Sequence, residues 1–274
     1  MISWLVLILI GMLSAILGSL VGIGGGIIIV PTLIYFGMEL HILEGITPQI
    51  AIGTSSLILI ITGLSSTLGY LKVKQVDVKN GSIFLFGLIP GALIGSVLSR
   101  YLTFDAFNLY FGIFLIFVSI LLLVRHRIKP MTWFENARYL KSYTDLQGVT
   151  HHYSVHPVVA VVTTFVIGVI SGLFGIGGGA LMTPLMLIVF RFPPHVAVGT
   201  SMMMIFFSSV ASSAGHIVQG HVAWGYALIL IVSSYFGAQL GVRLNQRMQS
   251  DMIVNLLRIV MLCMGLYLII KSFL

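Results

Sequence analysis

Long runs of apolar residues constrain the fold of this chain more than any other feature of its sequence. A helix needs about 20 apolar residues to cross the hydrocarbon core of a bilayer. Lipid offers no partners for backbone N–H and C=O groups, so runs of this length indicate helices rather than strands. The runs cover residues 5–20, 83–98, 104–124, 158–173, 223–240 and 253–270. The sequence therefore predicts an all-α polytopic membrane protein.

Composition and charge exclude several other classes of protein. Hydrophobic residues make up 58% of the chain and charged residues 8%, whereas soluble domains carry about 25% charged residues. The net charge of +7 comes from Lys and Arg in short segments between the apolar runs, where membrane topology accounts for it, so nucleic acid is not an expected partner. The single cysteine, Cys263, lies inside the last run, which excludes an intramolecular disulfide and a cysteine metal site. The first run lacks a basic start, so we expect it to be a mature helix rather than a signal peptide.

Four short patterns occur twice in the same order, which predicts an internal repeat. Residues 18–26 (GSLVGIGGG) return as 171–179 (SGLFGIGGG), with an offset of 153 positions. Residues 48–55 (PQIAIGTS) return as 194–201 (PHVAVGTS), with an offset of 146, which two shorter patterns share. We therefore expect two homologous halves, 1–124 and 157–274, joined by a polar cytoplasmic linker, 125–156.

The second apolar segment of each half is too short to cross a membrane as one helix. Segments 27–36 and 180–190 each follow a glycine cluster and contain a proline, so we expect short helices of broken crossings. If these segments complete a crossing, the halves are inverted, and eleven Lys and Arg residues share the linker's side against two on the other. If they are re-entrant, the count is nine against four. Because positive residues favour the cytoplasmic side, the sequence favours inverted repeats with eight to ten membrane segments and both termini outside, and re-entrant segments remain the alternative. Inverted repeats are typical of secondary transporters.

The two repeated motifs together resemble the sulfite exporter TauE/SafE family of bacterial permeases. GIGGG followed by an apolar stretch to a proline, and then AxGTS, occur once in each half. The resemblance covers nearly the whole chain apart from the linker. It implies a multi-pass protein of the cytoplasmic membrane that moves a small anion, such as sulfite, another sulfur oxyanion or an organosulfonate. The connection at residues 38–45 is longer than its counterpart in the second half.

The glycine clusters are the first candidates for substrate binding. Consecutive glycines leave backbone N–H groups accessible, and a helix that begins after them adds the positive end of its dipole. The cluster residues are Gly22, Gly24, Gly25, Gly26, Gly175, Gly177, Gly178 and Gly179. The alternative is that these glycines allow close helix packing.

The repeated Gly-Thr-Ser elements are the second candidates. They lie six to eight residues into helices that begin at a proline, so their hydroxyls approach the centre of the bilayer from opposite sides on the inverted topology. Their residues are Gly53, Thr54, Ser55, Gly199, Thr200 and Ser201. The alternative is that each hydroxyl bonds to its own helix.

Few other groups suggest chemistry. The chain has no Walker motif and almost no carboxylates within its apolar runs, so we expect no ATPase, metal site, cofactor or catalytic residue, and an intramembrane enzyme is a weaker interpretation. Arg258 either reaches the cytoplasmic surface or attracts an exiting anion. His216 and His221 flank a short external loop, which leaves proton coupling open beside the interpretation as polar loop residues. The expected partners are a small anionic substrate, whether a sulfur oxyanion or an unrelated small organic anion, and membrane lipid.

Overall fold

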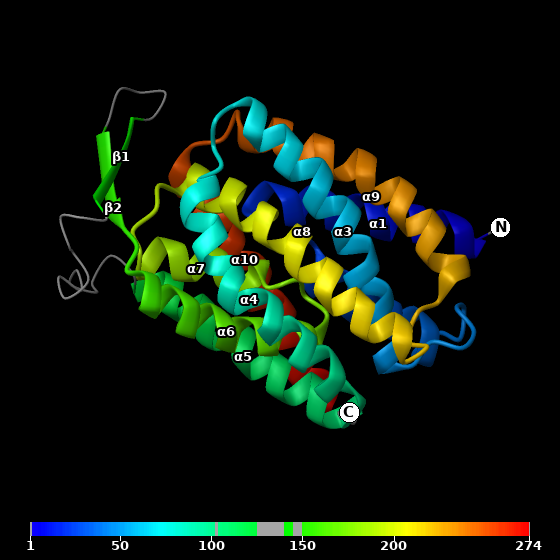
Figure 1. Ribbon diagram of the computed structural model, residues 1–274. Coiled ribbons are helices and arrows are strands. Elements are labelled where there is room, and N and C mark those ends of the chain that lie inside the picture. Colours follow the sequence, from blue (N-terminus) through cyan, green and yellow to red (C-terminus); the bar gives the residue numbers. More distant parts are fainter. Residues whose placement is uncertain (1, 102–103, 125–139, 145–149, 274) are drawn as a thin grey trace.

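The structure of the chain is a computed structural model that describes residues 2–101, 104–124, 140–144 and 150–273 (Figure 1). Its longer helices are α1 (Ile2–Val21), α3 (Pro48–Lys72), α4 (Val78–Leu98), α5 (Phe104–Val124), α6 (Pro157–Phe174), α8 (Pro194–Val218), α9 (Trp224–Asn245) and α10 (Ser250–Ser272). The shorter ones are α2 (Gly26–Ile34), which continues into the π-helix η1 (Tyr35–Glu39), the 3₁₀-helix η2 (Ser99–Tyr101) and α7 (Gly179–Ile188).

The predicted all-α membrane protein is confirmed at the level of its helices. Among the described residues, α1, α3, α4, α6, α8, α9 and α10 are the seven helices long and apolar enough to cross a membrane. The expected eight to ten segments include α5 and the short helices α2 and α7 in addition. Both short helices begin at their glycine cluster and contain a proline, Pro31 and Pro184, as the sequence predicts.

The linker differs from the prediction because it contains β-structure. Strands β1 (Leu140–Thr144) and β2 (Thr150–Ser154) form an antiparallel hairpin in which Leu140 pairs with Ser154. Tyr153 fixes the hairpin to the helices, since its ring lies 4.4 Å from that of Phe192 and its hydroxyl donates to Asp77 Oδ2 at 2.9 Å. The hairpin has no apolar run that would have revealed it in the sequence. Residues 125–139 and 145–149 of the predicted linker lie outside the described residues.

The helices pack with α3 and α8 against each other at the centre (Figure 1). Helix α9 packs on α1 and α3, α4 packs on α6 and α8, and α10 packs on α5. Glycines make the outer pairs close. A Cβ at Gly91 of α4 would overlap the carbonyl oxygen of Phe165 in α6, and one at Gly237 of α9 would overlap that of Met12 in α1. Such close backbone contact through small residues is how membrane helices associate.

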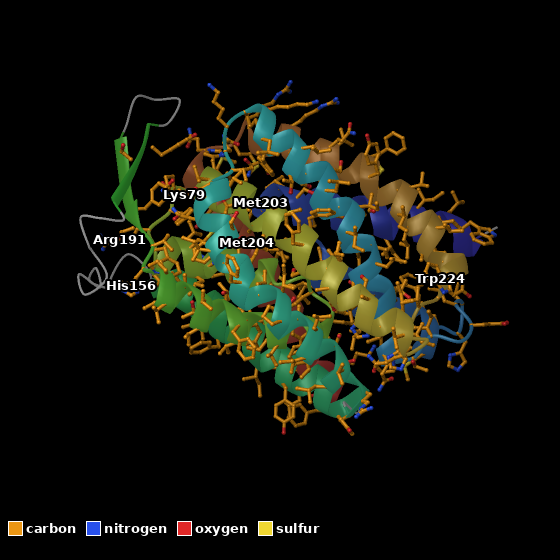
Figure 2. All side chains as sticks on the ribbon, in the orientation of Figure 1. Lys79, His156, Arg191, Met203, Met204 and Trp224 are labelled. Carbon is orange, nitrogen blue, oxygen red and sulfur yellow. The ribbon has the colours of Figure 1, made fainter. Side chains whose placement is uncertain are left out.

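The bundle has two ends, which differ in charge. Lys79, His156 and Arg191 lie beside the hairpin, whereas Trp224 lies at the opposite end (Figure 2). We call these the linker end, formed by residues 73–77, 150–156, 189–193 and 246–249, and the terminal end, formed by residues 40–47, 99–101, 219–223 and 271–273. The short segment α2–η1 returns to the terminal end, where Glu39 pairs with Lys271 Nζ at 2.8 Å.

Candidate functional site

The two glycine clusters form loops that only glycine adopts easily. Backbone φ is +78° at Gly22, +85° at Gly24 and +93° at Gly25, and it is +68°, +66° and +75° at Gly175, Gly177 and Gly178. L-residues with a side chain rarely take such angles. We call residues 22–26 the first loop and 175–179 the second loop. Every residue of both loops is buried.

Each loop turns the chain back into the bundle, so that a short helix begins in the interior. A Cβ at Gly25 would lie 2.7 Å from the carbonyl oxygen of Ser14, inside α1 rather than at its end. The loops also face each other, because a Cβ at Gly26 would lie 2.8 Å from Gly175 O and one at Gly179 would lie 2.8 Å from Gly22 O. The N-termini of α2 and α7 therefore converge in the buried centre.

The serines of the Gly-Thr-Ser elements hold these loops, and each serine contacts the loop that is more distant from it in the sequence. Ser55 Oγ donates to Gly175 O at 3.0 Å, and Ser201 Oγ donates to Gly22 O at 2.9 Å. Thr183 of α7 donates to the same Gly22 oxygen at 2.8 Å. The structure thus brings Ser55, Ser201 and both glycine clusters together.

The threonines of the same elements lie elsewhere. Thr54 Oγ1 accepts the N–H of Ala223 at 3.0 Å in the α8–α9 connection, and Thr200 Oγ1 accepts the N–H of Asp77 at 2.9 Å in the α3–α4 connection. Gly53 and Gly199 allow this contact. A Cβ at either would overlap a carbonyl oxygen, that of His221 or that of Gln75 respectively. Gly53 and Thr54 therefore anchor a connection at the terminal end, and Gly199 and Thr200 anchor one at the linker end.

Several backbone donors in the loops lack an acceptor. Within the described part of the chain, the N–H groups of Gly25, Gly26 and Ile27 have no hydrogen-bond partner, and neither do those of residues 177–180. The first N–H groups of any helix have no partner within the helix, and a buried helix start needs one from outside. Successive N–H groups in this backbone conformation form a concavity that binds anions, and the helix dipole adds to it.

The second loop also has two neighbouring hydroxyls that the sequence analysis missed. Ser171 Oγ and Ser209 Oγ are buried and have no hydrogen-bond partner among the described residues. A Cβ at Gly178 would lie 3.4 Å from Ser171 Oγ, and one at Gly177 would lie 2.9 Å from Ser209 Oγ. A buried hydroxyl without a partner is costly. Ser171 opens the repeated pattern 171–179, but its counterpart Gly18 carries no hydroxyl, and Ser209 lies outside both motifs, so neither serine stands out in a single sequence.

The ionisable candidates do not join this centre. His216 is fully buried, with its Nε2 3.3 Å from Gly172 O and its Nδ1 unpaired within the described structure, so its interpretation as a polar loop residue is wrong. His221 is half-buried in the adjacent connection, and burial lowers its pKa. Arg258 bonds to Asn255 on its own helix. No group of three or more His, Cys, Asp or Glu residues that could hold a metal occurs among the described residues.

Comparison with known proteins gives the family. The model of the family described as sulfite exporter TauE/SafE matches residues 7–268. The chain is 43% identical over 270 residues to probable membrane transporter protein YunE of Bacillus subtilis, covering 98% of each chain. It is 28% identical over 274 residues to a probable membrane transporter protein of Methanocaldococcus jannaschii, covering 96% of this chain and 94% of the relative. No solved structure matches the chain. These relatives are named as transporters. The chain is a multi-pass membrane protein that belongs to the sulfite exporter TauE/SafE family.

Proposed function

We propose that the chain is a secondary permease that moves a small anion, such as sulfite, another sulfur oxyanion or an organosulfonate, across the bacterial cytoplasmic membrane. The observation that carries the proposal is the convergence of two buried helix N-termini whose loop N–H groups lack protein acceptors. An oxyanion has several acceptor oxygens and a negative charge, so it satisfies these donors and interacts favourably with both helix dipoles. A neutral substrate would supply no charge for the dipoles.

The binding site of this proposal comprises both glycine loops and the serines that hold them. The N–H groups of the loops contact the anion, while Ser55 and Ser201 fix the carbonyls of Gly175 and Gly22 and so keep the N–H groups pointing at the centre. Thr54 and Thr200 do not contact the anion in this proposal. Each instead links a connection at one end of the bundle to a central helix by a hydrogen bond. A movement of either connection therefore reaches the site through one hydrogen bond.

The two halves are, on this proposal, inverted repeats with the linker end in the cytoplasm. Helix pairs that the repeat relates make equivalent contacts: α1 packs on α9 as α6 packs on α4, and α3 packs on α9 as α8 packs on α4. The basic residues in or beside the linker-end connections are Lys72, Lys74, Lys79, Arg191, Arg243 and Arg247. The described basic residues at the terminal end are Arg100 and Lys271. Positive residues concentrate on the cytoplasmic side.

Flux measurements on purified protein in liposomes test the function. Sulfite, sulfate, an alkanesulfonate and a carboxylate are compared, each with and without a pH gradient. We expect a sulfur oxyanion or the sulfonate to move faster than the carboxylate. Preference for the carboxylate would favour a permease for an unrelated organic anion, and no anion flux under any gradient would reject the proposal. The gradient arm also decides whether transport is coupled to protons.

Cysteine labelling tests the orientation independently of flux. In a Cys263→Ser background, a cysteine at position 273 is expected to react from outside, and one at position 74 from the cytoplasm. Labelling of position 273 only from the cytoplasmic side would reject the inverted arrangement with external termini.

A further inference from the structure

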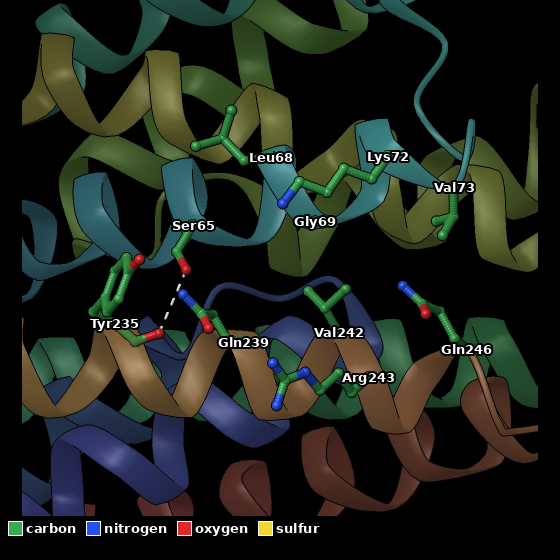
Figure 3. A pocket seen from close by; sticks show the side chains of 10 residues that line it. All are labelled: Ser65, Leu68, Gly69, Lys72, Val73, Tyr235, Gln239, Val242, Arg243 and Gln246. Atoms are coloured by element: carbon green, nitrogen blue, oxygen red, sulfur yellow. Dashed lines mark hydrogen bonds between the residues drawn. The ribbon is translucent and has the colours of Figure 1, made fainter.

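A basic cleft opens between α3 and α9, away from the glycine loops (Figure 3). Its volume is ≈ 350 Å³. The lining residues are Ser65, Leu68, Gly69, Lys72, Val73, Tyr235, Gln239, Val242, Arg243 and Gln246. Ser65 Oγ donates to Tyr235 O at 3.4 Å across it. The cleft lies near the linker end, where α3 finishes at Lys72 and α9 at Asn245.

The polar end of the cleft suits an anion. Lys72 and Arg243 are its cations, Gln239 and Gln246 add amide donors, and none of its ten lining residues is acidic. Neither cation has an ion-pair partner among the residues that the structure describes. Arg243 lies in the last turn of α9, where the sequence predicts for it a role in topology and at the anionic lipid surface. Two unpaired cations flanked by amides match the oxygens of a phosphate group.

The rest of the cleft suits a hydrocarbon chain. Leu68 is 52% exposed and Tyr235 is 43% exposed. Both lie within helices apolar enough to span the membrane, so the cleft opens toward lipid rather than only toward water. A free inorganic anion would leave this apolar wall uncovered. An amphiphile with a negative head covers both parts.

The matching region of the other half lacks this charge. The 146-residue offset aligns Lys72 with Val218 and Arg243 with Val97, and these valines are 88% and 47% exposed. Cations therefore occur in the cleft at the linker end, and apolar side chains take their places at the terminal end. Such asymmetry fits a ligand present in one leaflet.

We propose that the α3–α9 cleft binds the headgroup phosphate of an anionic phospholipid, with Lys72 and Arg243 on the phosphate and an acyl chain along Leu68 and Tyr235. The amides of Gln239 and Gln246 contact the remaining headgroup oxygens. Basic pockets between helices near the membrane surface are recognised sites for anionic headgroups. The site is separate from the glycine loops, so the lipid stays bound while the substrate moves.

The test measures retention of phosphatidylglycerol against phosphatidylcholine by the purified full chain in mixed detergent micelles. The Lys72→Gln/Arg243→Gln variant is compared with Lys79→Gln/Arg247→Gln, which removes equal charge at the same end but outside the cleft lining. We expect the wild type to prefer phosphatidylglycerol, and the cleft variant to bind it about ten-fold to thirty-fold more weakly, as expected for two cations near a lipid surface. The control variant should keep most of the preference.

Inorganic sulfate and phosphate form a second arm that distinguishes a lipid from a free anion. Neither salt should displace the lipid beyond the effect of sodium chloride at equal ionic strength. Displacement specific to sulfate or phosphate would show a small-anion site and overturn the proposal. An equal loss of phosphatidylglycerol binding in both variants would show an effect of general surface charge and overturn the proposal. The absence of a preference for phosphatidylglycerol in the wild type would also overturn it. None of these outcomes depends on anion flux, so the proposed function is judged separately.

Discussion

The two glycine loops share the sequence Gly-Ile-Gly-Gly-Gly and the same left-handed backbone, yet their surroundings differ. Around the first loop, Gly18 lies so close that a Cβ there would overlap the backbone nitrogen of Gly25. Thr62 donates to its own helix at Ile58 O. The first loop is therefore packed against main chain at Gly18, and the hydroxyls that reach it, those of Ser201 and Thr183, both donate to Gly22 O.

Around the second loop, the matching positions carry hydroxyls that face the loop. The predicted repeat aligns Gly18, Thr62 and Gly63 with Ser171, Ser208 and Ser209. Ser208 Oγ donates to Gly177 O at 2.8 Å, while Ser171 and Ser209 remain unpaired in the described structure. The fold therefore maintains two similar loops but places unpaired side-chain hydroxyls, those of Ser171 and Ser209, beside the second loop. We therefore expect the bound anion to lie closer to the second loop.

Large side chains at the loops should have the largest effect. Gly25→Leu and Gly178→Leu should both abolish flux, because each side chain enters a buried loop with positive φ and fills the approach to the N–H groups. Flux in liposomes and melting temperature in detergent are measured on the same preparations. If neither variant folds, the melting data would assign the glycines a role in packing alone.

The corresponding alanines sharpen the comparison. A Cβ at Gly25 meets the main-chain oxygen of Ser14 at 2.7 Å, whereas one at Gly178 meets the flexible Leu88 Cδ1 at 3.2 Å. Both pay about 1–2 kcal/mol for the left-handed conformation. Gly25→Ala should therefore lower the melting temperature more than Gly178→Ala, and equal effects would argue against the difference between the loops.

Removing the spare hydroxyls should weaken binding without weakening the fold. A hydrogen bond to a charged group contributes about 1.5–3 kcal/mol, so Ser171→Ala and Ser209→Ala should each raise the apparent KM about ten-fold to a hundred-fold. Stability should be unchanged or slightly higher, because an unpaired buried hydroxyl is lost. Thr62→Val removes a buried hydroxyl that bonds within its own helix, so it is the control and should leave KM unchanged. An unchanged KM in both serine variants would place the anion elsewhere.

The two threonine anchors should differ in stability. From sequence alone, Thr54→Val and Thr200→Val are expected to weaken anion affinity. In the structure, however, each threonine hydroxyl accepts a hydrogen bond from a backbone N–H, so we expect the loss to affect stability instead. Loss of the Thr200 hydroxyl leaves the buried amide of Asp77 unpaired, at a cost of about 1–3 kcal/mol, whereas the amide of Ala223 is only partly buried. Thr200→Val should cost more, since its partner Asp77 also caps α4 and accepts from Tyr153 of the hairpin. Denaturation in detergent measures this, and a larger effect of Thr54→Val would contradict it.

The sequence predicted the helices well because lipid permits so few alternatives. Apolar runs, paired glycine clusters and prolines at 48 and 194 mark helix ends through local chemistry, and Pro48 and Pro194 are indeed the first residues of α3 and α8. The internal repeat remains a prediction from the sequence, and it suggested which residues to compare. It did not predict that Ser55 would bond to the loop of the other half, since that depends on the packing of α3 against α8.

What the sequence missed depends on three-dimensional neighbours. The hairpin is held by contacts of Tyr153 with Asp77 and Phe192, which are far apart along the chain. The sequence offers proton coupling or a polar loop position for His216, yet His216 lies in the last turn of α8 and is buried against Gly172. Ser171 and Ser209 look like ordinary helix serines until the second loop is folded beside them.

Acidification is expected to have a smaller effect on stability, and this effect should come from His221 at the terminal end. The repeat aligns His216 and His221 at the terminal end with Tyr70 and Gln75 at the linker end. Burial lowers the pKa of His221, so the folded state binds fewer protons than the unfolded state between that lowered pKa and the ordinary value of about 6.5. Stability should therefore rise with pH through this window and fall on acidification. Melting curves of the wild type and His221→Gln check this, and an identical pH dependence would exclude His221 as a contributor.

The smallest effect is expected where the second half carries cations and the first does not. Arg243 and Arg247 align with Val97 and Tyr101, and we assign both to the cytoplasmic surface rather than to the transported anion. Arg243→Lys with Arg247→Lys keeps both charges, so the orientation set by positive residues and the attraction to anionic lipid should persist. Flux should then stay within about two-fold of the wild type, because a surface charge that is kept changes little free energy. Proteoliposome flux and membrane insertion are measured together. Complete loss of flux with normal insertion would show that the guanidinium groups themselves contact the substrate, and the asymmetry between the halves would then extend from the second loop to the mouth of the transport path.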